Sequence, residues 1–267
     1  MNRSFQGTAT AAVGVVLGFV AIFMDFFSGF GHSSKYSDDG SILAFLLVTL
    51  ILTAILLAAY VGGNESLGIA AAVTGSIAFG FYLFIPGAYG FNHFDVVATG
   101  AWLGVCTGLI PLGLLYARAS TPRAVTSPPL EAALPAIVGR LCCLIALWWV
   151  ADSGTSYWNL ADKGRALPAL MLLLVIGGGA LGVMTALQPR THLTADGTLV
   201  LGAMTFGLYE ALLIGDAFDE FGSMGWCAWL GSAGALVLLV GVVKVWKAAT
   251  GRGVRPVTTA AVAPPAV

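Results

Sequence analysis

Long apolar runs recur along this 267-residue chain, separated by short polar or glycine-rich segments. Several reach the ~20 residues that a helix needs to cross the ~30 Å hydrocarbon layer of a bilayer. Only 9% of the residues are charged, against roughly 25% in soluble globular domains, so the chain cannot build a water-soluble surface. A β-barrel would instead show short segments of alternating polarity. The sequence therefore predicts an all-α, polytopic integral membrane protein.

We expect about eight transmembrane helices. They are predicted near residues 11–27, 42–61, 68–85, 96–116, 136–150, 166–187, 198–214 and 224–245. A Pro-, Ser- and Thr-rich stretch lies between the fourth and fifth of these. The predicted organisation is a first four-helix repeat at 1–118, a cytoplasmic linker at 119–132, a second four-helix repeat at 133–248, and a tail at 249–267. The tail alternates small residues with prolines, a composition typical of disorder.

The distribution of Lys and Arg predicts the orientation, because cytoplasmic loops of membrane proteins are enriched in both. If the N-terminus is cytoplasmic, most basic residues lie inside: Arg3, Arg118, Arg123, Arg190, Lys244, Lys247, Arg252 and Arg255. Lys35, Lys163 and Arg165 then lie outside. Arg140, near the start of the fifth predicted span, is expected to snorkel to the cytoplasmic interface. We therefore expect a cell-membrane protein with both termini in the cytoplasm.

Short motifs recur in the same order in the two halves. The pattern Phe-Gly-x-Tyr at 79–82 returns 127 residues later, as does Ala-Trp-Leu-Gly at 101–104. The pairs Ser-Gly at 28–29 and Phe-Asp at 94–95 return at shifts of 125 and 124. Four spans are an even number, so both copies enter the membrane from the same side. The sequence therefore predicts two parallel four-helix repeats, related by an axis along the membrane normal.

Small residues at four-residue spacing mark expected helix contacts. The glycines concerned are Gly100, Gly104 and Gly108 on the fourth span, Gly231 on the eighth, and Gly80 and Gly207 on the third and seventh. Small side chains let helix backbones approach closely in lipid, so tight helix packing is the main interpretation. A pore lined by these glycines is the alternative, and nothing in the pattern requires it.

One carboxylate interrupts an apolar span, and it is the main candidate for a functional residue. Glu210 lies about 9 Å of helix rise from the predicted outer boundary, where the first repeat has Leu83. Ionisable groups at that depth need a partner or a wet cavity, and they commonly mark ion or substrate pathways. We expect Glu210 to face the protein interior, where Tyr82, Tyr209 and serine or threonine hydroxyls on neighbouring spans are its available partners. The alternative is a protonated Glu210 that serves only helix packing.

The histidines provide only a weak candidate for a metal site. His32 and His93 fall in predicted outer loops, and Asp95 follows His93 closely. Solvated loop histidines without ligand spacing are more common than metal ligands, so no metal is expected. All three histidines are predicted to lie in loops. The chain also lacks an intramembrane pair of histidines for haem.

No enzyme signature appears, and no cofactor is expected: the chain has neither a phosphate-binding loop nor a dinucleotide fingerprint. No basic tract points to nucleic acid. The leading hypothesis is a small transporter or permeation protein for an ion or small solute. The alternative is a non-enzymatic accessory or scaffold subunit, favoured by the scarcity of polar groups within the spans. The partners expected are the lipid bilayer and either another membrane protein or a second copy of the chain.

Overall fold

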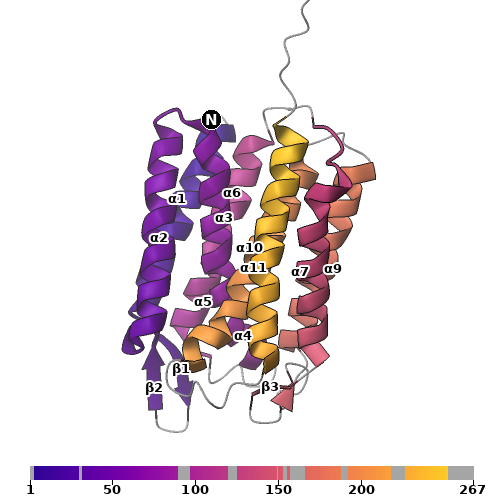
Figure 1. The fold of residues 1–267 in the computed structure, drawn as a ribbon. Helices are drawn as coiled ribbons and strands as arrows, with labels where there is room; N and C mark the ends of the chain where they lie inside the picture. The colour runs from indigo at the N-terminus through magenta and orange to yellow at the C-terminus, as the bar shows by residue number, and fades with distance from the viewer. Residues whose placement is uncertain are drawn as a thin grey trace, which may run out of the picture.

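The computed structural model describes residues 3–29, 32–89, 97–119, 125–148, 150–152, 155–156, 166–187, 192–217 and 226–251. Long helices run side by side through the molecule, and two small β-hairpins lie at one end of the bundle (Figure 1). The predicted helical fold is confirmed. The hairpins are an addition that the apolar pattern did not predict.

The first half of the chain follows one helix with a hairpin and then adds further helices. Its elements are α1 (Arg3–Ile22), β1 (Asp25–Gly29), β2 (His32–Lys35), the 3-10 turn η1 (Tyr36–Asp38), α2 (Gly40–Val61), α3 (Glu65–Tyr82), α4 (Phe84–Tyr89), α5 (Thr99–Val105), the 3-10 turn η2 (Cys106–Gly108) and α6 (Leu109–Arg118). The second half has a similar order. Its elements are α7 (Leu130–Trp148), β3 (Val150–Asp152), β4 (Thr155–Ser156), α9 (Ala166–Leu187), α10 (His192–Ala217) and α11 (Trp226–Thr250).

Six helical stretches among the described residues are long and apolar enough to cross a membrane: Arg3–Ile22, Gly40–Val61, Thr99–Arg118, Leu130–Trp148, Leu167–Leu187 and Ala228–Thr250. A shorter apolar helix covers Ser66–Tyr82. Helix α10, which carries Asp196 and Glu210, is not one of the six. Helices of this length and composition fit a polytopic membrane protein.

Three helices begin well before the residues that the hydropathy pattern predicted. Helix α1 begins at Arg3 instead of near residue 11, α7 at Leu130 instead of near residue 136, and α10 at His192 instead of near residue 198. Polar residues made these turns resemble loops in the sequence. In the fold, His192 and Asp196 are buried and hydrogen-bonded, so the backbone continues as helix. The prediction that all three histidines lie in loops is therefore wrong for His192.

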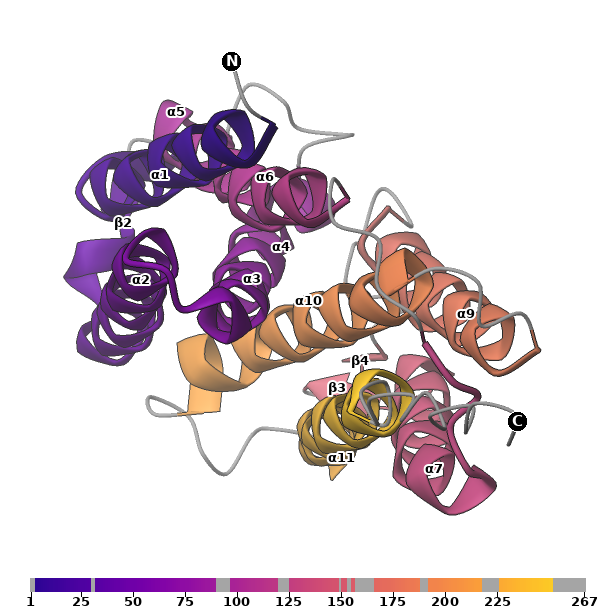
Figure 2. The ribbon, with the colours of Figure 1, turned by 90° about the horizontal axis from the view of Figure 1, so that it is seen from above.

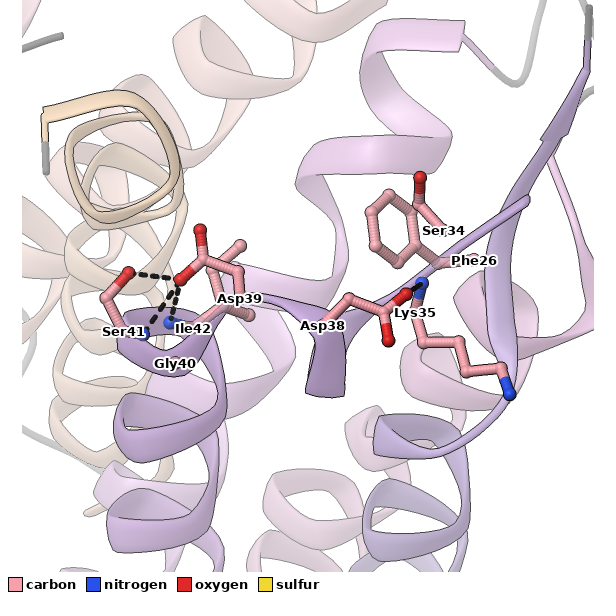
Figure 3. Close-up of a pocket in the computed structure, with 8 residues that line it drawn as sticks. All are labelled: Phe26, Ser34, Lys35, Asp38, Asp39, Gly40, Ser41 and Ile42. Carbon is pink, nitrogen blue, oxygen red and sulfur yellow. Dashed lines mark hydrogen bonds between the residues drawn. The ribbon is translucent and has the colours of Figure 1, made fainter. Parts of the chain in front are cut away.

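Helix α2 shows how local sequence sets a boundary. Asp39 precedes its first turn, and the Asp39 carboxylate accepts hydrogen bonds from the backbone N–H groups of Ser41 (2.8 Å) and Ile42 (3.1 Å) (Figure 3). These bonds satisfy donors that the first turn cannot pair internally. At the other end, Gly63 has a φ of 103°, a conformation that glycine adopts without steric cost.

Seen from above, α10 crosses the molecule between two groups of helices (Figure 2). Helices α1, α2, α3, α5 and α6 lie on one side, and α7, α9 and α11 lie on the other. Helix α10 packs against α3 of the first group and against α9 and α11 of the second. The contact between the two halves therefore depends chiefly on α3 and α10.

Both ends of the described chain lie at the same end of the bundle. The start of α1 and the end of α11 are opposite the hairpins β1–β2 and β3–β4 (Figure 1). We call these the terminal end and the hairpin end. Large apolar side chains on the outward faces are exposed, among them Val48, Leu173 and Ile176 at 64%, 67% and 56%. Such extensive apolar exposure suits contact with lipid.

Candidate functional site

Glycines form the closest contact between the two halves. A Cβ atom added at Gly80 of α3 would overlap the carbonyl of Met204 on α10, and one added at Gly207 would overlap the carbonyl of Ile77. Gly80 and Gly207 are 127 residues apart, and so are Ile77 and Met204. The two contacts are therefore equivalent under the shift seen in the sequence. Each helix presents a glycine to the backbone of the other, which allows the close approach that small residues permit in lipid.

Tyr82 and Tyr209 are fully buried in matching environments. The Tyr82 hydroxyl donates to the carbonyl of Gly18 on α1 (2.9 Å), and the Tyr209 hydroxyl donates to the carbonyl of Cys143 on α7 (2.7 Å). Gly18 and Cys143 are 125 residues apart. Each hydroxyl has one proton to donate, so neither proton is left for Glu210.

The remaining glycines of the predicted stripe pack against neighbours in their own half. An added Cβ at Gly104 would overlap the Tyr82 ring, and one at Gly231 would overlap the Tyr209 ring. At Gly108 it would meet the Phe79 ring, and at Gly100 it would meet the carbonyls of Met24 and Asp25. All of these glycines contact protein closely, in keeping with the packing interpretation.

Glu210 is half-buried on α10, between the buried residues Tyr209 and Ala211. Ser232 of α11 is the polar side chain that interacts with it. The Ser232 Oγ is buried, yet no partner lies within normal hydrogen-bond limits. The Glu210 and Ser232 side chains are thus close to each other where α10 packs against α11, without a hydrogen bond between them.

A buried ionic cluster at the terminal end was not predicted from the sequence. Arg118, the last residue of α6, pairs with Asp196 of α10: Nε lies 2.8 Å and Nη2 3.4 Å from the two carboxylate oxygens. Their side chains are only 5% and 0% exposed. Trp246 of α11 donates its indole N–H to Asp196 (2.6 Å), and the His192 ring nitrogen Nε2 lies 3.2 Å from the Arg118 carbonyl oxygen.

This cluster joins the two halves, because Arg118 belongs to the first half and the other three residues to the second. From the sequence, Arg118 is expected only as a cytoplasmic charge, and Asp196 has no predicted role. Helical spacing offered a signal: Asp196 lies eleven residues before Gly207, which is close to three turns. The two residues therefore share the face of α10 that packs against the first half.

Arg140 does not reach the terminal interface as expected. It lies ten residues after the start of α7, and its Nη2 donates to the carbonyl of Gly178 on α9 (2.8 Å). Its Nε is buried without a hydrogen-bond partner. The early start of α7 explains the difference, since it places Arg140 near the middle of the helix.

The candidate metal ligands His93, Asp95 and the His32 side chain lie outside the described residues. Among the residues that are described, no three His, Cys, Asp or Glu side chains gather as a metal site.

Glu210 lines neither of two cavities that the described residues form. One of about 590 Å³ lies at the hairpin end, lined by Phe26, Ser34, Lys35, Asp38, Asp39, Gly40, Ser41 and Ile42 (Figure 3). Partial burial raises the pKa of Asp39, but the hydrogen bonds from Ser41 and Ile42 outweigh burial and hold the pKa below its usual value. The other, of about 620 Å³, lies between α7 and α9.

Comparison with models of known families, with curated proteins and with solved structures finds no match. The fold fits the class of polytopic α-helical membrane proteins.

Proposed function

We propose that this protein is a small transporter or permeation protein for an ion or small solute. The observation that carries the proposal is the buried Arg118–Asp196 pair, which joins the two halves at the terminal end. In this proposal the chain has eight transmembrane helices in two parallel four-helix repeats. Both termini lie in the cytoplasm.

Matched contacts support the two repeats. The glycine contacts of α3 and α10 are equivalent under a shift of 127 residues, and the two tyrosine hydrogen bonds under shifts of 125 and 127. The hairpins β1–β2 and β3–β4 follow the first helix of each half and lie at the same end. A parallel duplication produces such pairs from one ancestral set of contacts.

The ion pair supports a moving interface, because a buried pair of this kind adds little net stability to a fixed contact. Taking two charges out of water offsets most of their attraction, so replacing such a pair with apolar residues is often neutral or stabilising. A pair that joins two bodies and adds little net stability suits a contact that opens and closes. Buried Arg118, His192 and Asp196 also add to the polar groups inside the bundle, whose scarcity was the argument for a scaffold.

The positions along α10 indicate how such a transporter would move. Asp196 lies about 16 Å of helix rise on one side of Gly207, and Glu210 lies about 5 Å on the other. The tight Gly80–Gly207 crossing then serves as a pivot. Opening the Arg118–Asp196 pair admits the solute from the terminal end, and Glu210 binds a proton or cation nearer the hairpin end.

The test is flux in reconstituted vesicles with imposed proton and cation gradients. Glu210→Gln should preserve folding and abolish proton- or cation-dependent flux. Glu210→Leu, which copies Leu83 of the first half, should also fold and be inactive. Glu131→Gln is the control, because Glu131 is exposed in the first turn of α7. Flux that is unchanged in both Glu210 variants would remove Glu210 from the mechanism.

Topology is tested independently of transport. Cysteine labelling at Ser127 and at Val267 in intact cells should report the cytoplasm for both positions. External labelling at either position would overturn the proposed orientation.

The second candidate function is an accessory or scaffold subunit, and the closed packing of the halves favours it. Neither cavity is lined by Glu210, and α3 and α10 leave no room at their glycine contacts. A scaffold should co-purify with a membrane partner or as a defined homo-oligomer and show no flux under any gradient. On this account Glu210→Leu is folded and retains the partner.

A further inference from the structure

Arg140 places an incompletely paired cation inside the second half. Its Nη2 donates to Gly178, while its Nε is buried without a partner. The described residues place no carboxylate within ion-pair distance of it. Position 15, the equivalent 125 residues earlier, is the buried Val15, so the first half has no such cation. An unpaired guanidinium in an apolar surrounding is costly.

The cavity of about 620 Å³ lies at this guanidinium. Its volume falls within the roughly 300–1,000 Å³ of typical ligand sites. Among the described residues that line it, Arg140 is the only charged one and Thr198 the only other one with a polar side chain. Apart from Pro128 and Val245, the rest of the lining comes from α7 (Leu130, Ala133, Ala136, Ile137 and Leu141) and α9 (Gly179, Gly182, Val183, Ala186 and Leu187).

The cavity is lined chiefly by α7 and α9, and these two helices lie at the outer side of the bundle (Figure 2). Leu130, Leu141 and Leu187 on its rim are 71%, 53% and 76% exposed. In a membrane, such a rim faces acyl chains rather than water. A small soluble anion would match Arg140 but not these walls, whereas an anionic lipid would match both.

Glycines on α9 let the guanidinium lie against that helix. A Cβ added at Gly179 would sit 3.6 Å from the Arg140 Cδ and Nε, and one at Gly182 would sit 3.9 Å from its Nη2. Larger side chains here would fill the space beside the cation. Two exposed lysines, Lys244 and Lys247, lie near the terminal end of α11. Basic residues between and beside helices on the cytoplasmic side are typical of binding sites for anionic lipid headgroups.

We propose that the cavity between α7 and α9 is a binding site for an anionic phospholipid, whose phosphate pairs with Arg140 while an acyl chain lies along the apolar walls. This site is separate from Glu210 and does not depend on the proposed transport function.

The test is native mass spectrometry of the purified full chain in detergent, with phosphatidylglycerol or diacylglycerol, which lacks the phosphate, added. The unchanged protein should bind one phosphatidylglycerol at least about tenfold more tightly than diacylglycerol, since hydrogen bonds to charged groups are worth that factor or more. Arg140→Gln should abolish this preference. Ala186→Trp should weaken binding of both lipids, because Ala186 lines the wall and carries no charge.

Lys244→Gln is the matched control: it removes one positive charge near the same end, outside the cavity lining. It should keep the preference. Each variant is scored by the ratio of the two lipids bound to folded protein, so a lower yield does not imitate a lost preference. Equal loss in Lys244→Gln, an unchanged ratio in Arg140→Gln, or full competition by inorganic phosphate would each overturn the site.

Discussion

Replacing Asp196 with alanine should strongly destabilise the protein, because it leaves Arg118 buried without its counter-charge. The guanidinium makes two contacts with the carboxylate, at 2.8 and 3.4 Å, and both side chains are almost fully buried. Removing one partner of such a pair typically costs about 3–5 kcal/mol. The indole N–H of Trp246 also loses its acceptor at 2.6 Å, so we expect a value in the upper part of that range.

The measurement is a double-mutant cycle. Asp196→Ala, Arg118→Ala and the double variant are unfolded by denaturant in detergent micelles, with helical circular dichroism as the readout. A buried pair should give a coupling energy above about 1 kcal/mol, as contacting residues show coupling of roughly 0.5–3 kcal/mol. The apolar double variant Arg118→Met with Asp196→Leu should restore most of the stability.

Additive effects in the cycle, or a loss of less than about 1 kcal/mol for Asp196→Ala, would refute the argument. Such a result would place the pair among exposed ion pairs, whose median contribution is roughly 0–1 kcal/mol. The coupling between Arg118 and Asp196 would then be too weak to hold the proposed closed contact between the halves.

Three further predictions concern packing, hydrogen bonding and capping. Gly207→Val should prevent the close crossing of α3 and α10, since even a Cβ would overlap the Ile77 carbonyl. The expected result is a loss of folded protein on size-exclusion chromatography. A normal yield of folded protein would contradict it. Tyr209→Phe should cost about 1 kcal/mol through the lost hydrogen bond to Cys143, measured by denaturant unfolding; no change would contradict the buried bond. Asp39→Ala should cost roughly 0.5–2 kcal/mol through the lost cap of α2. Because the pKa of Asp39 is lowered in the fold, its stabilisation is complete above the ordinary carboxyl value of about 3.9 and disappears as the pH falls through the folded pKa. A difference between Asp39→Ala and the unchanged protein that persists at pH 2 would contradict this.

The sequence by itself determined the class of the protein and most of its helices. Membrane-length apolar runs predict helices because lipid offers no partner for unpaired backbone groups. The spacing of small residues also predicted that Gly80, Gly104, Gly207 and Gly231 pack tightly, since backbone approach depends on residue size alone. These properties are local, so they can be read from neighbouring positions.

Only the tertiary structure decided which polar groups meet. Arg118 and Asp196 are 78 residues apart, and no local pattern links them; their burial follows from how α6, α10 and α11 pack. For the same reason Tyr82 and Tyr209 were predicted as partners of Glu210, whereas their hydroxyls donate to carbonyls of α1 and α7. A polar side chain inside a membrane must find a partner, but the partner is chosen by helix packing across the whole bundle.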